Sequence, residues 1–365
     1  MCSSDLEERL PLSEWFAVIA HFGFVSLPLD TRRPLRELLR DLDRTVVPDA
    51  LRGPQILATL TGLLFAFEAF TGILLAFHYR PTPEAAHAST LAIVRDIPLG
   101  GLIQPLHAWG ALLLVLVVVL RLVRLFWDGL WKAPRELLWV SAVALVWLSL
   151  QFTFTGRLLP WDVDGYWSTV RGLEVVYALP IVGPVLAFLL GGEVVGEEIL
   201  TRFYVLHVVV LPLMWVGTLY ATFATLRRVG FGATSLKMAT RRETTFRQHR
   251  YDLAFVTLYL FAALVALATL MPFGLRSVAD PYATPLVARP PWYMGAVFVV
   301  QEHLPIAGWL VGGVLLVLAL GVLALPWWAP RVSARFPEAR LRMAGLVTIT
   351  VWLVLSLVAV LVDRP

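Results

Sequence analysis

The chain contains one cysteine, Cys2, in 365 residues. A single cysteine excludes a disulfide within the chain, a four-cysteine iron–sulfur cluster and a C-x-x-C-H haem attachment site. Charged residues are also scarce, at 15%, whereas 58% of the residues are hydrophobic and the mean hydropathy is +0.75. Soluble domains rarely combine so little charge with so many apolar residues, so the composition indicates an integral membrane protein.

The apolar residues form blocks that are long enough to cross a bilayer at about 20 residues each. Lipid offers no hydrogen-bond partners to the backbone, so such blocks are expected to be helices. The sequence therefore predicts an all-α membrane protein with seven spans, at residues 55–79, 103–127, 137–157, 200–226, 253–272, 308–328 and 343–362.

Basic residues gather in alternate loops. Seven arginines precede the first span and seven Lys or Arg residues lie in the 227–250 loop, whereas the 157–200 loop is acidic. The positive-inside rule then predicts a cytoplasmic N-terminus, a C-terminus outside and a prokaryotic-type inner membrane. The basic pI of about 9.4 reflects this topology, and nucleic acid is not an expected partner.

The first 54 residues are polar and rich in arginine, so no cleavable signal peptide is expected there. Residues 30–45 alternate Leu and Arg at helical spacing, which predicts an amphipathic helix on the cytoplasmic surface. Residues 1–29 carry no pattern that assigns them a structure.

Two histidines, His107 and His207, lie inside the second and fourth predicted spans. Both spans run from the outer to the inner side, so the two imidazoles are expected at similar depth. An ionisable or metal-binding side chain in a span is costly, and it indicates a functional site. A histidine pair on facing helices can ligate haem iron, although a histidine can also be a core residue bonded to a backbone carbonyl.

Four motifs in this order and spacing resemble cytochrome b, the membrane subunit of quinol–cytochrome c and plastoquinol oxidoreductases. They are GLLFAFEAFTGILLAFHY at 62–79, GRLLPW at 156–161, LTRFYVLH at 200–207 and PPWY at 290–293. The likeness extends over roughly residues 50–330. It implies a cytoplasmic N-terminal segment (1–54), a four-helix haem bundle (55–230) and a three-helix C-terminal domain with a quinol motif (231–365).

The resemblance implies that His107 and His207 ligate one haem b, in the outer, low-potential position. Gly72 and Gly156 match the glycines that let the porphyrin approach two helices, because no Cβ intrudes there. Arg202 matches an arginine that pairs with a haem propionate. Arg157 stands where the family often has an aromatic residue, and Gln104 replaces a further arginine; we hypothesise that Arg157 supplies the missing propionate partner.

The family carries a second, inner haem, whose ligands and glycines lie fourteen residues from the first set, or about 21 Å of helix. Here those positions are occupied by residues that cannot ligate iron, which predicts that the inner haem is absent: Ala58, Arg121, Ala142 and Ala221. One alternative is that the alanines are there because alanine is common in membrane helices, and that Arg121 extends to the cytoplasmic interface. Another is that His21 or His249 supplies a substitute ligand. Neither histidine lies in a predicted span.

The quinol motif is altered as well. The family has P-E-W-Y, whose glutamate is thought to accept a quinol proton, whereas this chain has Pro290-Pro291-Trp292-Tyr293. Tyr293 remains a catalytic candidate, and Glu302 and His303 are candidate proton acceptors because they follow closely, although they can equally be an interfacial polar pair. Glu68, in the first span and four residues before Gly72, is expected to be a neutral hydrogen-bonding group or part of a proton path.

The resemblance thus implies a membrane subunit of a quinol:acceptor oxidoreductase. A quinone pocket is expected near Gly156–Ser168 and Pro290–Tyr293. The implied partners are a Rieske-type iron–sulfur subunit, a cytochrome c-like subunit and a second copy of the chain. Because one haem interrupts the inward electron route, three functions remain open: outer-side electron transfer without a complete Q-cycle, a partner's cofactor replacing the inner haem, and a haem-binding scaffold without turnover.

Overall fold

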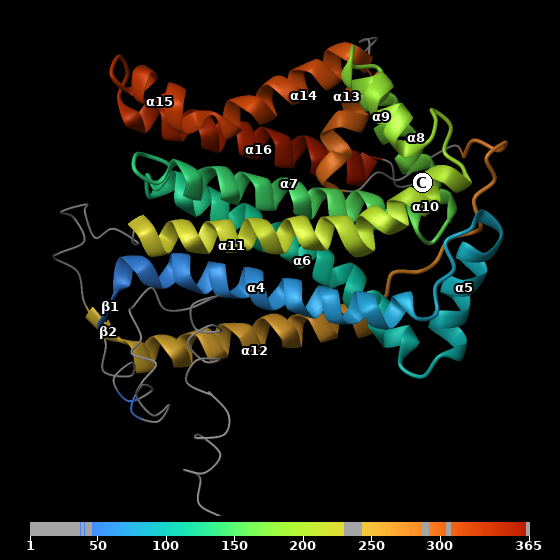
Figure 1. The fold of residues 1–365 in the computed structure, drawn as a ribbon, viewed down its shortest axis with the longest axis horizontal. Helices are drawn as coiled ribbons and strands as arrows, with labels where there is room; N and C mark the ends of the chain where they lie inside the picture. Colours follow the sequence, from blue (N-terminus) through green and yellow to red (C-terminus); the bar gives the residue numbers. More distant parts are fainter. Residues whose placement is uncertain are drawn as a thin grey trace, which may run out of the picture.

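The computed structural model describes residues 37, 40, 46–229, 243–285, 292–303 and 308–362. Four long apolar segments run side by side in it (Figure 1), namely α4 (Asp49–Ala76), α6 (Gly100–Trp127), α7 (Glu136–Leu158) and the continuous span formed by α10 (Glu197–Val205), η1 (Leu206–Val210) and α11 (Leu211–Val229). The predicted amphipathic helix at 30–45 and residues 1–29 lie outside the described residues, apart from residues 37 and 40.

The core of this bundle consists of aliphatic and aromatic side chains from all four segments. Leu64 of α4, Leu145 of α7 and Trp215 of α11 are fully buried, and Phe65 stacks on Trp215 with ring centres 3.9 Å apart. Only about a third of the residues in each of these four spans are buried, so much of their apolar surface is on the outside of the bundle. Such a surface is suited to lipid or to neighbouring membrane helices.

Three short helices cap one end of the bundle, at the right of Figure 1: α5 (Pro83–Asp96), α8 (Val163–Tyr177) and α9 (Val182–Leu190). This end is called the α8 end below. The opposite end, called the β1 end, carries a two-stranded antiparallel sheet of β1 (Val46–Pro48) and β2 (Glu243–Thr245), in which Val47 is paired with Thr244. This sheet holds the start of α4 beside the start of α12 (Phe246–Leu270).

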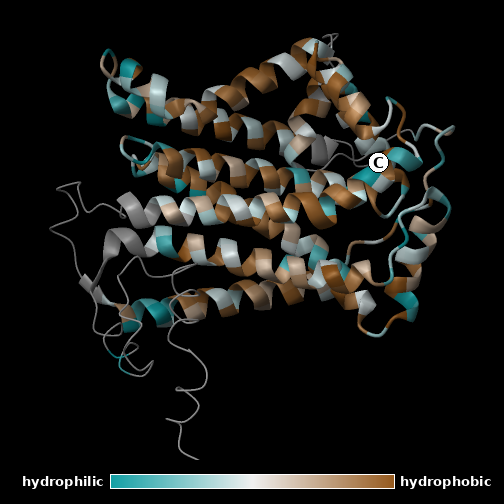
Figure 2. Cartoon of the chain, in the orientation of Figure 1, coloured by the Kyte–Doolittle hydropathy of each residue, from teal (hydrophilic) through white to brown (hydrophobic). Residues whose placement is uncertain are grey.

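The C-terminal part lies on two sides of the bundle. Helix α12 packs against α4 and α6, whereas α14 (Gly308–Leu323) packs against α7 and α8. The short helices η2 (Trp292–Met294) and α13 (Gly295–His303) pack against α16 (Glu338–Val362). Figure 2 shows that hydrophobic colours dominate these long helices.

The expected span at 308–328 is interrupted. Helix α14 ends at Leu323, and α15 (Leu325–Ser333) leaves it at an angle of 78°. Among the described residues, six helices are long and apolar enough to span a membrane, or seven if this bent pair counts as one span. All six overlap the predicted spans, and together with the bent pair they agree with an all-α membrane protein.

Candidate functional site

His107 and His207 face each other inside the bundle at the α8 end. His107 lies in the second turn of α6, and His207 lies in η1. The centres of the two imidazole rings are 6.2 Å apart, and their planes are inclined at 74°. The sequence therefore identified two residues that the fold brings together from segments 100 residues apart.

A threonine hydroxyl orients each imidazole. Thr71 Oγ1 lies 2.9 Å from His107 Nδ1, and Thr155 Oγ1 lies 3.1 Å from His207 Nδ1. Each hydroxyl also donates to a backbone carbonyl one turn earlier, that of Phe67 or Gln151. The hydroxyl oxygens therefore accept from Nδ1–H, and this arrangement leaves each Nε2 with a lone pair for a metal.

A glycine follows each of these threonines and makes room for the ring. A Cβ on Gly72 would lie 3.2 Å from His107 Cε1, and one on Gly156 would lie 2.7 Å from His207 Cε1. The contact at Gly156 is closer than carbon atoms approach without displacement, and the one at Gly72 is tight enough that the ring would have to shift by a few tenths of an ångström. The same Thr-Gly pair thus occurs on α4 and on α7, each opposite one histidine, and the threonines were not foreseen from the sequence.

Glu68 completes the surroundings of His107. Its side chain is buried at 8% exposure, and Oε2 lies 3.0 Å from His107 Nδ1. Gly110 on α6 leaves space for this carboxyl group, because a Cβ there would collide with Glu68 Oε1. The carboxyl group predicted to act near the histidines therefore contacts one of them directly, and Gly110 is a further residue that sequence reasoning missed.

The geometry fits a haem held between the two rings. With ring centres 6.2 Å apart, the two imidazoles leave room for one metal ion between them at about 2 Å per metal–nitrogen bond. The facing imidazoles and the glycines opposite them are the features that such a group would need. In addition, η1 is a π-helical turn, an irregularity that is frequent at functional sites.

The π turn corrects one position assigned from the sequence. Because such a turn contains one more residue than an α-helical turn, a count of fourteen residues from His207 to Ala221 does not stay on one helix face. Ala221 is exposed, whereas its neighbour Thr222 is buried at 2% exposure. The residue at the predicted inner level on this span is therefore Thr222, which is also not a haem ligand.

The structure also describes the other three residues assigned to that level. Arg121 and Ala142 are buried in the bundle, and Ala58 lines a small cavity next to Arg121. His21 lies outside the described residues. His249 is buried in the first turn of α12, a helix that begins at Phe246 and is long enough to span a membrane, and its role as a substitute ligand stays a prediction.

The two arginines predicted to contact propionates both have protein partners. Arg202 donates to the carbonyl oxygen of Leu189 at 2.8 Å, at the end of α9, and to Glu198 at 3.4 Å. Arg157 Nε donates to Ser168 Oγ at 3.1 Å. Arg157 therefore links the end of α7 to α8, and the role of both residues toward a propionate stays a prediction.

Tyr293 joins the PPWY segment to the bundle. The Thr153 hydroxyl of α7 donates to Tyr293 Oη at 2.7 Å, and Trp352 Nε1 donates to the Tyr293 carbonyl oxygen at 3.0 Å. Burial raises the pKa of Tyr293 to about 12, so its phenol is protonated at neutral pH. Pro290, Pro291 and the side chains of Glu302 and His303 lie outside the described residues, so the predicted proton acceptors stay predictions.

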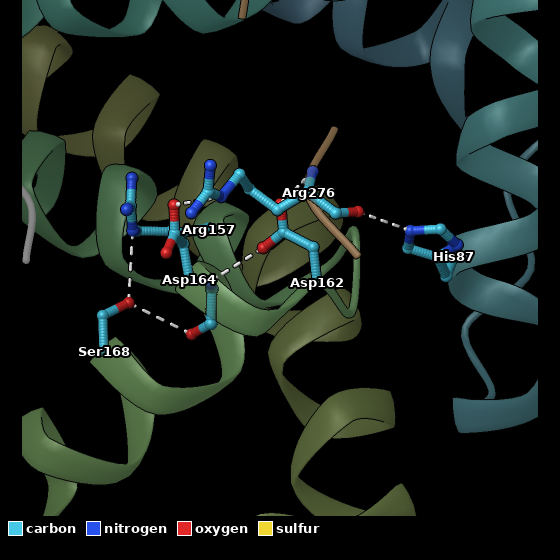
Figure 3. A network of polar contacts seen from close by, with 7 residues as sticks. His87, Arg157, Asp162, Asp164, Ser168 and Arg276 are labelled. Atoms are coloured by element: carbon cyan, nitrogen blue, oxygen red, sulfur yellow. Dashed lines mark hydrogen bonds and ion pairs between the residues drawn. The ribbon is translucent and has the colours of Figure 1, made fainter. Parts of the chain in front are cut away.

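A polar network closes the α8 end (Figure 3). Asp162 caps α8 by accepting from Gly165 N at 2.8 Å, and it also accepts from Arg276 N at 3.3 Å. Arg276 contacts Asp164 through its side chain, and its carbonyl oxygen bonds His87 Nε2 at 2.8 Å. Burial raises the pKa of Asp162, against the opposing effect of these hydrogen bonds.

The family model described as Cytochrome b/b6/petB matches residues 43–230, slightly more than half of the chain. The chain belongs to this family. Cytochrome b6 of Heliobacterium modesticaldum (strain ATCC 51547 / Ice1) is 41% identical over 205 residues, which are 55% of this chain and 96% of that protein. Cytochrome b6 of Synechococcus sp. (strain RCC307) is 34% identical over 221 residues, 60% of this chain and 95% of that protein.

A solved chain titled "Hyperthermophilic respiratory Complex III" matches this cytochrome b/b6 family member with a TM-score of 0.75 at 19% identity. The match covers 100% of this chain and 92% of that one. At this identity the likeness shows the fold, and it includes the C-terminal helices that the family model leaves unmatched. Membership of the family implies a b-type haem, and the histidine pair is a site that fits one.

Proposed function

We propose that this chain is the membrane subunit of a quinol-oxidising electron-transfer complex and holds one haem b between His107 and His207. One observation carries the proposal: two imidazoles 6.2 Å apart, each fixed through Nδ1 by a threonine that precedes a glycine. When bound there, the haem accepts and donates single electrons. The protein's part is to ligate the iron and to fix the orientation of both rings.

Glu68 and the threonines modulate the ligands. A hydrogen bond from Nδ1–H to an oxygen raises the basicity of the imidazole and fixes its tautomer. His107 Nδ1 has the Thr71 hydroxyl at 2.9 Å as a hydrogen-bond partner and a Glu68 carboxylate oxygen at 3.0 Å as an ion-pair contact, whereas His207 has the Thr155 hydroxyl and no carboxylate partner among the described residues. We infer that His107 is the more strongly donating ligand of the two.

We further propose that the inner haem of the family is absent from this chain. The support is chemical: Ala58, Arg121, Ala142 and Thr222 at that level offer no imidazole, and the guanidinium of Arg121 has no lone pair for a metal. A redox path from the quinol through this chain then ends at the haem beside the α8 end. The absence of a second haem favours electron transfer on the outer side over a complete path through two haems.

The quinol is proposed to bind near the α8 end, between the segments 156–168 and 290–293. The Thr153–Tyr293 and Arg157–Ser168 hydrogen bonds support this proposal, because Thr153 and Arg157 flank the Thr155–Gly156 pair that contacts His207. The neutral phenol of Tyr293 can donate a hydrogen bond to a quinone oxygen. Glu302 and His303 are proposed as acceptors of the quinol proton.

The membrane topology and the partner subunits are also part of the proposal. We propose a cytoplasmic N-terminus and an outer C-terminus in a prokaryotic-type inner membrane, so that the histidine pair lies toward the outside. The domain limits at residues 54 and 230 are proposed as well. The proposed partners are a Rieske-type iron–sulfur subunit, a cytochrome c-like subunit and a second copy of the chain.

The deciding experiment measures haem content and quinol-dependent reduction of the purified protein. A pyridine haemochrome assay is expected to give one haem b per chain, and addition of a reduced quinol analogue is expected to produce the reduced b spectrum. Two haems per chain would overturn the proposed absence of the inner haem. One haem that quinol never reduces would replace the redox proposal with that of a scaffold.

Matched glycine variants test the location of the haem. Gly156→Ala is expected to lose most of the haem because its Cβ meets the His207 ring, whereas Gly217→Ala, on α11 with no atom within 4 Å of the added Cβ, is expected to retain it. Equal haem contents in the two variants would contradict the assignment of His207 as a ligand.

A further inference from the structure

Arg121 of α6 is a buried cation to which the described residues supply no partner. The residue lies near the β1 end and is 5% exposed. Its Nη1 atom is shielded from solvent and, among the described residues, has neither a hydrogen-bond acceptor nor an ion-pair partner. Burying an unpaired charge is strongly unfavourable, so a buried guanidinium ordinarily has an acceptor.

The neighbouring residues do not supply that acceptor. Arg124, one turn further along α6, is itself cationic, and its Nε donates to Asp128 Oδ2 at 2.7 Å. Lys132 pairs in the same way with Glu338 at 2.7 Å. Asp128 and Glu338 are therefore engaged by other cations, and neither of them is an ion-pair partner of Arg121.

A small cavity adjoins the two arginines. It measures about 20 Å³, and its lining consists of the two guanidinium-bearing side chains and otherwise apolar residues, namely Pro54, Ala58, Arg121, Arg124, Leu125, Leu130 and Leu138. A cavity of about 10–15 Å³ holds one water-sized group. An oxygen of an anionic group fits into this space, whereas a quinone ring or a porphyrin does not.

The depth of the cavity indicates where the anion comes from. Arg121 lies six residues before the end of α6, or about 9 Å along the helix axis. The α6 helix of 28 residues exceeds the roughly 20 residues that cross the hydrocarbon core, so its last turns are at the level of the lipid headgroups. Basic pockets between spans at this level suit phosphate-bearing headgroups.

We propose that Arg121 and Arg124 form a binding site for a phosphate group, with one phosphate oxygen bound by the Arg121 guanidinium inside the cavity. The source is either a phospholipid headgroup or free phosphate. A phosphate offers several acceptor oxygens, which match the planar donor fork of a guanidinium. The site lies at the opposite end of the bundle from the histidine pair and does not depend on the function proposed for that pair.

Lipid binding to the full-length, delipidated protein tests this site by native mass spectrometry and thermal shift. The probes are dioleoyl-phosphatidylglycerol, dioleoylglycerol, which has no phosphate, and inorganic phosphate. The phospholipid is expected to remain bound and to raise Tm, whereas dioleoylglycerol is not. The same response to inorganic phosphate alone would identify free phosphate as the source, and a response to neither phosphate probe would overturn the proposal.

Arg121→Gln is expected to weaken phosphate-dependent binding at least tenfold, because a charge-assisted hydrogen bond is lost. Arg331→Gln is the matched control, since Arg331 is a cation of α15 that bonds a carbonyl oxygen of its own helix. If both variants bind the phospholipid as the unmodified protein does, the proposal is wrong. Haem absorption monitors whether each variant is folded.

Ala58→Glu provides a second test that keeps Arg121. A carboxylate at this cavity-lining position is expected to take the place of the phosphate. The lipid-free protein should then gain thermal stability, and the response to phosphatidylglycerol should disappear. A variant that is not stabilised and that retains the full lipid response would contradict the proposal, even if Arg121→Gln fails to fold.

Discussion

At the scale of single residues, a Thr-Gly pair contacts each of the two histidines. Thr71-Gly72 on α4 faces His107, and Thr155-Gly156 on α7 faces His207. The threonine fixes the ring through Nδ1, and the glycine removes the Cβ that would collide with the ring. Both tasks must be performed by adjacent residues because the ring packs against a single turn of the opposite helix.

The role of the threonine as a hydrogen-bond acceptor can be tested at His207. Thr155→Val preserves the shape of the side chain but removes the acceptor of His207 Nδ1–H, so haem affinity should fall about tenfold or more. The weaker ligand should also raise the midpoint potential. Haem per chain and a redox titration provide the measurement. Thr269→Val, which removes only a bond to a carbonyl one turn earlier, is the control and should behave like the unmodified protein.

Asp162 gives a residue-scale prediction about pH. Because burial raises its pKa above the ordinary value of 3.8, the folded protein binds this proton more tightly than the unfolded chain does. Stability from this residue is therefore lost as pH rises from about 4 through the folded pKa. Asp162→Asn, which still caps α8, should gain Tm relative to the unmodified protein as pH increases over this interval.

Thermal midpoints in detergent at several pH values measure this effect. Asp96→Asn, at an exposed position, is the control. A constant difference between Asp162→Asn and the unmodified protein would show that Asp162 does not contribute to the pH dependence.

Sequence reasoning located the histidines but not their supporting residues. Histidine is rare enough in apolar segments that a pair at one depth stands out. Threonine is ordinary there, and Thr71 and Thr155 both make the usual bond to a carbonyl one turn earlier. Their second contact, to an imidazole of another helix, exists only once the helices are packed, so no local pattern reveals it.

At the scale of elements, the π turn at Leu206–Val210 changes which residues share a face. Hydropathy detects an apolar span but not one additional residue within a turn, which is why the spacing pointed to Ala221 and not to Thr222. The sequence did not predict the break between α14 and α15 for a related reason. Apolar residues continue through the break to Leu325 and Pro326, and hydropathy carries no information about the angle between two helices.

Deleting one residue tests the π turn. Removal of Val209 should convert the turn into α-helix while keeping the faces of α10 and α11, so that Trp215 remains buried and the protein is still produced. Haem content should fall because His207 loses its position. Removal of Val216 instead rotates the rest of α11 by about 100° and should abolish folding. Yields of monodisperse protein and haem per chain distinguish these outcomes, and equal yields would contradict the prediction.

At the scale of the whole molecule, contacts between the matched region and the later helices occur at both ends. At the α8 end, Val163 N donates to Ser277 O at 3.0 Å, and Ala279 N donates to Trp161 O at 3.0 Å. At the β1 end, Lys132 pairs with Glu338, and Trp139 Nε1 donates to Val322 O at 2.7 Å. The family model ends at residue 230, so the sequence motifs did not reveal how these parts are joined.

The contacts around Arg276 join the four-helix bundle to the later helices without using the peptide bonds that connect them. The two regions should therefore assemble even when they are produced as separate polypeptides from separate genes. Residues 1–235 and 236–365, produced together, are expected to co-purify and to hold haem. Arg276→Ala combined with Ala279→Pro removes the ion pair to Asp164 and the N–H that Trp161 O accepts. This double variant should weaken co-purification of the divided protein far more than it affects the continuous chain, where the covalent link keeps the partners at high local concentration. Failure of the two pieces to associate would show that the peptide link itself is required.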